Sequence, residues 1–201
     1  MDQFEVLDGL PATGPMYVPV SSSTDPFYSE GYVVRFFSKN GAEWVGNFRP
    51  GLGEFSGTFG FPEHDKVLVV AGGQAYLMSP SKYEPLLKFG GQIEEALMNE
   101  DGDLIFRDLI RIIVIRRRTG ELWMSERISW DGLRNLKVAG ANLSGEAWGP
   151  TITSRIQQEW VSFDLDLRRK KLTGGSVGKT LSGDGGILFD AYEHPTSLWA
   201  L

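Results

Sequence analysis

Short apolar runs alternate with glycine-containing turns over most of the chain, and this pattern limits the possible folds more than any other feature. Typical runs are GYVVRFF (31–37), VLVVA (67–71) and LIRIIVI (109–115). Such runs have the length of strands and are too short for most helices. The 25 glycines among 201 residues follow no fixed period, which excludes a collagen-like chain and favours the turns of antiparallel sheets. The sequence therefore predicts an all-β fold.

Residues 159–167 (EWVSFDLDL) show the clearest strand pattern. Apolar side chains alternate there with polar ones: Val161, Phe163, Leu165 and Leu167 against Ser162, Asp164, Asp166 and Arg168. Side chains of a strand point to opposite faces with a period of two. We therefore expect the first set to face the core and the second set to face water.

Hairpin-like units begin near residues 31, 67, 109 and 159, which gives a weak internal repeat. This repeat predicts antiparallel repeated hairpins in a propeller-like or two-layer arrangement. Residues 1–30 contain four prolines and are predicted to form an irregular N-terminal arm, followed by a single β domain over residues 31–201. Residues 91–100 (GQIEEALMNE) contain helix-forming residues, so a short helix is an alternative to a strand there.

Composition excludes several classes of site. The chain has no cysteine and only two histidines, His64 and His194, so thiolate and multi-histidine metal sites are excluded and no cofactor or metal is predicted. A net charge of −6 argues against nucleic-acid binding. The longest apolar run falls far short of a membrane span, and the N-terminus lacks the features of a secretory signal. We expect a cytoplasmic protein with no membrane association.

The segments RISWDGLRNL (127–136) and LSGEAW (143–148) contain the candidate binding residues. These are Arg127, Trp130, Asp131, Arg134, Glu146 and Trp148. Tryptophan and arginine are the residues that most often anchor protein interfaces. The alternative is structural, with an Asp-Gly turn and a packed tryptophan. No catalytic residue is predicted. The carboxylates of Asp131 and Glu146 would suit a hydrolase only if they faced each other across a cleft.

Two basic clusters, RRR (116–118) and RRKK (168–171), lie at predicted strand ends or turns. If they converge in space, they could bind an acidic partner. The segment NEDGD (99–103) is predicted to be a hairpin turn, because Asp-Gly is a strong signal for a two-residue hairpin; its spacing does not match a calcium loop. The glycine-rich segment 174–180 does not match a phosphate-binding loop, because Thr173 occupies the position of the first glycine.

Several segments resemble a family of small, β-rich bacterial proteins that has no established activity. The residues that carry the resemblance are WVGNFRPG (44–51), VLVVAGGQAYLMSP (67–80), RISWDGLRNL (127–136), LSGEAW (143–148) and LTGGS (172–176). The resemblance extends over about residues 43–176. It implies a β-rich fold and points to no particular reaction.

These features together predict a non-catalytic protein-binding module. Its most specific form is an immunity-type protein that neutralises a cognate bacterial toxin by occlusion. The acidic charge suits a basic toxin domain as the partner, and six tryptophans could supply interface anchors. Two alternatives stay open: a carboxylate-based glycan hydrolase, and a structural or assembly module that pairs through an exposed strand edge.

Overall fold

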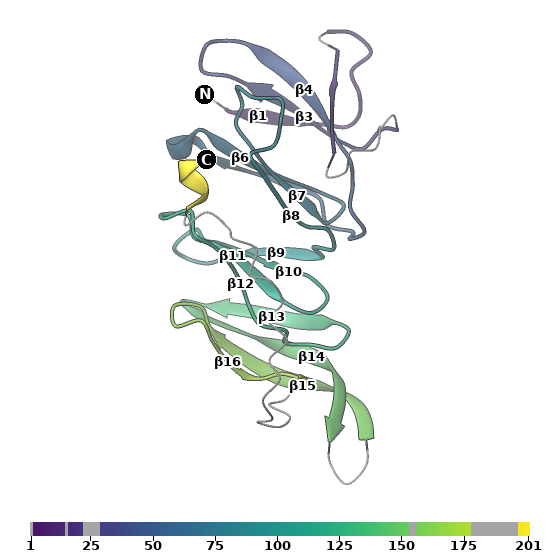
Figure 1. Ribbon diagram of the computed structural model, residues 1–201, viewed down its shortest axis with the longest axis vertical. Helices are drawn as coiled ribbons and strands as arrows, with labels where there is room; N and C mark the ends of the chain where they lie inside the picture. Colours follow the sequence, from purple (N-terminus) through teal and green to yellow (C-terminus); the bar gives the residue numbers. More distant parts are fainter. Residues whose placement is uncertain (1, 15, 22–28, 153–155, 178–196) are drawn as a thin grey trace. The chain divides into compact units, whose positions relative to one another are not determined.

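The computed structural model (Figure 1) describes residues 2–14, 16–21, 29–152, 156–177 and 197–201. Within these ranges, sixteen strands form four sheets of four strands each. Helical structure in the described ranges is limited to two short 3-10 turns, η1 and η2. All strand pairs are antiparallel except one. The predicted all-β fold of antiparallel hairpins is therefore confirmed. The described ranges contain no helix long and apolar enough to cross a membrane.

The chain forms two compact units, Met1–Glu94 and Glu95–Leu201. Residues 1–30, predicted to be an irregular arm, contribute two short strands to the first unit: β1 (Phe4–Leu7) and β2 (Val18–Val20). Pro19 is tolerated in β2 because this strand lies at the edge of its sheet. The single β domain over residues 31–201 stays a prediction.

The first unit contains two four-stranded sheets. In the first sheet, β3 (Tyr32–Phe37) and β4 (Glu43–Phe48) join β1 and β2 in the order β1-β3-β4-β2. The second sheet consists of β5 (Gly57–Phe61), β6 (Lys66–Ala71), β7 (Gln74–Met78) and β8 (Leu87–Gly90). The turn η1 (Pro62–His64) lies between β5 and β6. Phe36 and Phe48 from the first sheet pack in one buried cluster with Val69 and Tyr76 from the second. The core of this unit therefore lies between two layers.

The second unit has the same two-layer construction. One sheet consists of β9 (Glu95–Met98), β10 (Leu104–Arg107), β11 (Ile112–Ile115) and β12 (Leu122–Met124), and the other of β13 (Leu133–Ala139), β14 (Asn142–Ile152), β15 (Ile156–Asp166) and β16 (Lys171–Gly174). The turn η2 (Leu198–Ala200) follows near the C-terminus. The helix considered for residues 91–100 is wrong, because residues 95–98 form β9 and pair with β10.

The core of the second unit confirms the period-two pattern of β15. Phe163, Leu165 and Leu167 are buried with Ile112 and Val114 of the facing sheet. The alternate side chains Ser162 and Asp164 are exposed. The β13–β16 sheet therefore has one face in the core and one outer face. The two-layer arrangement describes each unit, and the propeller-like arrangement stays a prediction.

Candidate functional site

The six candidate binding residues all lie in the second unit. Arg127, Trp130 and Asp131 lie in the loop between β12 and β13, and three others lie in strands: Arg134 in β13, Glu146 and Trp148 in β14. The structure therefore brings the predicted residues to one region. It divides them into two groups, and Trp130 of one group and Trp148 of the other lie on opposite faces of β14.

The first group lies on the outer face of the β13–β16 sheet, and we call it the outer-face cluster. Arg134 and Glu146 are cross-strand partners, and Arg134 Nε donates a hydrogen bond of 2.8 Å to Glu146 Oε2. Trp148 is paired with Trp160 on β15, with ring centroids 5.2 Å apart. The guanidinium carbon of Arg134 lies 4.0 Å from the centroid of the Trp160 ring. Each indole thus has an aromatic neighbour, and one is also covered by a cation.

Two hydrogen bonds stabilise the ionised form of Glu146. Its Oε2 atom accepts from Arg134 Nε and from Asn135 Nδ2, each at 2.8 Å. These two donors, helped by the positive charge of Arg134, lower the pKa of Glu146 below its ordinary value of 4.5. The carboxylate is therefore ionised at neutral pH and paired with an arginine.

The second group, the loop cluster, consists of Arg127, Trp130 and Asp131. Arg127 donates hydrogen bonds of 2.9 Å to two main-chain carbonyls, Nε to Ser129 O and Nη2 to Trp130 O. Its guanidinium carbon lies 4.9 Å from the centroid of the Trp130 ring. The Trp130 side chain is nevertheless 50% exposed. The loop therefore presents an indole and a guanidinium that are already held in position.

Main-chain contacts attach the loop cluster to β14. The Trp130 N–H donates to Trp148 O at 2.9 Å, and Ser129 Oγ lies 2.8 Å from the same oxygen. The Trp130 ring lies over Gly149, because a β-carbon on Gly149 would stand 2.4 Å from Trp130 Cδ1. Successive residues of a strand face opposite sides, so Trp130 and the Trp148 side chain lie on opposite faces of β14. Sequence reasoning did not predict this separation.

Two residues of the outer-face cluster were not predicted from the sequence. Trp160 completes the outer-face cluster, and Asn135 provides the second hydrogen bond to Glu146. The alternation in residues 159–167 places Trp160 on the outer face, so that pattern contained a usable signal. Asn135 lies at a β-bulge with a φ of 54°, and no pattern in the sequence marks this bulge.

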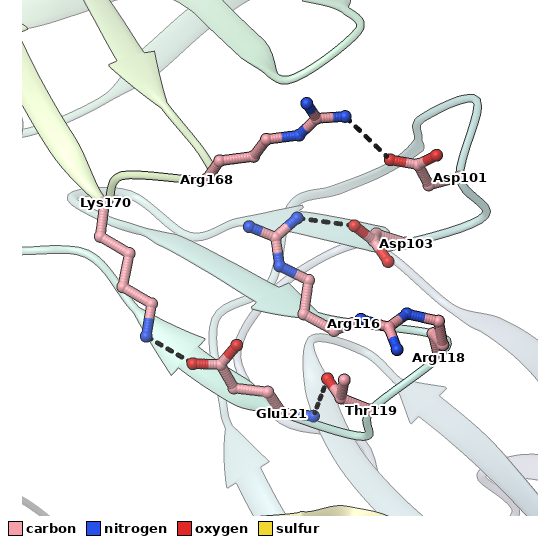
Figure 2. Close-up of a pocket in the computed structure, with 8 residues that line it drawn as sticks. All are labelled: Asp101, Asp103, Arg116, Arg118, Thr119, Glu121, Arg168 and Lys170. Carbon is pink, nitrogen blue, oxygen red and sulfur yellow. Dashed lines mark hydrogen bonds and ion pairs between the residues drawn. The ribbon is translucent and has the colours of Figure 1, made fainter.

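A charged pocket of about 460 Å³ lies elsewhere in the second unit (Figure 2). Three turns form it: residues 99–103 between β9 and β10, 116–121 between β11 and β12, and 167–170 between β15 and β16. The lining residues are Asp101, Asp103, Arg116, Arg118, Thr119, Glu121, Arg168 and Lys170. The two basic clusters therefore converge. The hairpin turn predicted for residues 99–103 is also confirmed, since it joins the paired strands β9 and β10.

The most buried ion pair of the pocket is structural. Arg116 Nη1 donates to Asp103 Oδ2 at 2.6 Å, and these side chains are only 17% and 7% exposed. Arg116 Nη2 also donates to Leu167 O, which ties the β15–β16 turn to the β11–β12 turn. Asp103 accepts further hydrogen bonds from Asn99 Nδ2 and the Arg117 N–H. This network holds the three turns together.

Among the residues that the structure describes, no group of three or more acidic or histidine side chains could hold a metal ion. Residues 178–180 of the glycine-rich segment lie outside the described ranges. No protein-family model matches the chain, and no curated protein matches it significantly. The family resemblance over residues 43–176 therefore stays a prediction, and the function has to be inferred from the geometry.

Proposed function

We propose that the protein is a non-catalytic module that binds another protein through the loop cluster. The observation that carries this proposal is the half-exposed Trp130, which lies beside Arg127 in a loop bonded to β14. Large exposed indoles next to arginine are typical centres of protein interfaces. Because hydrogen bonds already order this loop, binding would cost less conformational entropy than binding through a free loop.

The outer-face cluster supports the same proposal as a neighbouring contact area. Gly132 connects the two groups, since a β-carbon there would lie 3.4 Å from the Trp160 ring and 3.9 Å from Trp148 Cβ. The loop therefore crosses from one face of β14 to the tryptophans on the other.

The contacts of Glu146 favour binding over hydrolysis. A general acid in glycoside hydrolysis needs a raised pKa so that it holds a proton at neutral pH. The hydrogen bonds from Arg134 and Asn135 act in the opposite direction. Glu146 is therefore better suited to charge pairing than to proton donation, and the hydrolase stays the less favoured alternative.

The partner that we propose is a basic toxin domain, which the module would neutralise by covering its active surface. The support for this finer proposal is the net charge of −6. Opposite net charges accelerate association, and the effect weakens as salt screens it. We therefore expect the association rate with such a partner to fall steeply with ionic strength, and the dissociation rate to change little.

The test is quantitative affinity capture from lysate of the native cell with three tagged proteins. These are the wild type, the Trp130→Ala variant and the Leu52→Ala variant. Leu52 is 84% exposed and lies in the first unit, so its variant controls for the loss of an exposed apolar side chain. Circular dichroism first verifies that all three proteins are folded.

We expect one protein to be captured in stoichiometric amount by the wild type and by Leu52→Ala. With the tagged protein at a concentration below the dissociation constant, recovery with Trp130→Ala should fall about 30-fold, the loss typical of an interface anchor worth roughly 2 kcal/mol. Equal recovery with Trp130→Ala would contradict the proposed surface. Capture of no protein by any of the three would contradict the binding function itself.

A further inference from the structure

The charged pocket has a composition that structural ion pairing does not fully explain. It is lined by four cationic side chains and three carboxylates. Arg116 is committed to Asp103 and the Leu167 carbonyl, and Lys170 is paired with Glu121. The other two cationic side chains, Arg118 and Arg168, have no close ion pair among the described residues.

These two arginines retain free donors. Arg168 Nη2 lies 3.9 Å from Asp101 Oδ2, and both side chains are mostly exposed, at 73% and 66%. A pair of this length and exposure contributes little. Arg118 makes no hydrogen bond or ion pair with any residue in the described ranges. The paired carboxylates therefore leave a net positive charge in the pocket, with guanidinium donors available.

The turn that carries Arg118 is held from two directions. Within the turn, the Gly120 N–H donates to Arg116 O at 2.8 Å. From the C-terminus, Trp199 Nε1 donates to Arg117 O at 3.0 Å, and the Leu198 N–H donates to Gly120 O at 2.7 Å. The backbone on both sides of Arg118 is thus fixed. An arginine on a fixed turn loses less entropy when it binds an anion than one on a free loop.

We infer that this pocket binds a small phosphorylated molecule that also carries hydroxyl groups, such as a sugar phosphate. Guanidinium groups match phosphate oxygens in geometry and charge, so Arg118 would hold the phosphate, while Arg168 adds positive charge at another part of the pocket. The carboxylates of Asp101 and Glu121, which line the same pocket, would accept hydrogen bonds from ligand hydroxyls. A volume of about 460 Å³ is within the usual range for a small-molecule site.

This site is separate from the loop cluster, so the inference does not depend on the proposed protein-binding function. The test is isothermal titration of glucose 6-phosphate into the full chain, with glucose as the uncharged control. We compare the wild type with Arg118→Gln and Arg169→Gln. Arg169 is in the 167–170 turn, but its side chain is 83% exposed and does not line the pocket, so its variant removes the same charge nearby.

We expect saturable binding of one glucose 6-phosphate per chain and no measurable binding of glucose. Arg118→Gln should weaken the affinity about tenfold or more, because it removes charge-assisted hydrogen bonds. Arg169→Gln should change the affinity by less than about twofold, because an exposed charge outside the pocket is screened.

Three results would overturn the inference. The first is the absence of saturable binding by the wild type at millimolar ligand. The second is equal weakening by both variants, which would indicate non-specific charge attraction. The third is equal binding of glucose, which would remove the role of the phosphate. None of these outcomes bears on capture of a protein through Trp130.

Discussion

Replacing Gly120 by alanine should displace the C-terminal turn η2 from the β11–β12 turn. Gly120 has a φ of +68°, and an added β-carbon would lie 2.6 Å from Trp199 Cγ. The backbone conformation alone costs roughly 1–2 kcal/mol for a residue with a β-carbon. Forcing the indole out of its seat adds about 1–3 kcal/mol, the usual cost of overpacking. We therefore expect a total loss of about 2–5 kcal/mol in the free energy of unfolding.

Gly140 provides a matched control in the same unit. It has a φ of +56°, and no atom lies within 4 Å of where its β-carbon would stand. Gly140→Ala should therefore show the backbone cost alone, roughly 1–2 kcal/mol. The difference between the two variants isolates the clash with Trp199.

Urea unfolding followed by circular dichroism measures the loss of stability in both variants. Circular dichroism is used because its signal does not depend on tryptophan fluorescence, which replacement of Trp199 would change. In a Trp199→Ala background, the cost of Gly120→Ala should fall to that of Gly140→Ala. If Gly120→Ala and Gly140→Ala were equally destabilising in the wild-type background, the contact between η2 and the β11–β12 turn would be refuted. The support that we assign to Arg118 would then be lost as well.

Three further predictions concern the second unit. Because folding lowers the pKa of Glu146, its ionised carboxylate stabilises the folded protein at pH values above the ordinary pKa of 4.5. This stabilisation is lost as the pH falls through the lowered pKa. Glu146→Gln should therefore make the free energy of unfolding less sensitive to acid in pH titrations. Asp103→Asn should cost about 3 kcal/mol in urea unfolding because it leaves Arg116 unpaired, whereas Asp101→Asn at the exposed pair should cost less than about 1 kcal/mol. Phe163→Ala should lower the stability by about 3–5 kcal/mol, and a loss below about 1 kcal/mol would contradict its place in the core.

Local patterns in the sequence predicted the strands well. The alternation in residues 159–167 identified β15 and its buried face, because a period of two matches the geometry of a strand and not that of a helix. The hairpin-like unit that begins near residue 31 corresponds to the paired strands β3 and β4. For residues 91–100 local preference left a helix open as an alternative, and the pairing of β9 with β10 decides for a strand.

The arrangement of the sites could be predicted only in part. The two basic clusters were recognised, but their convergence depends on which strands neighbour one another, and local sequence patterns do not give that order. Trp130 and Trp148 were both named as candidate binding residues, yet Gly149 lets the Trp130 ring lie on the face of β14 opposite to Trp148. Such a separation depends on the path of a loop and is invisible to periodicity.

The most direct test of the central proposal is hydrogen–deuterium exchange of the protein alone and in complex with the captured partner. If the loop cluster is the binding surface, amide exchange should slow over residues 127–132 and over the neighbouring part of β14. Exchange in the first unit, including the loop around Leu52, should stay the same. Protection confined to the first unit, or to the turns of the charged pocket, would contradict binding through Trp130.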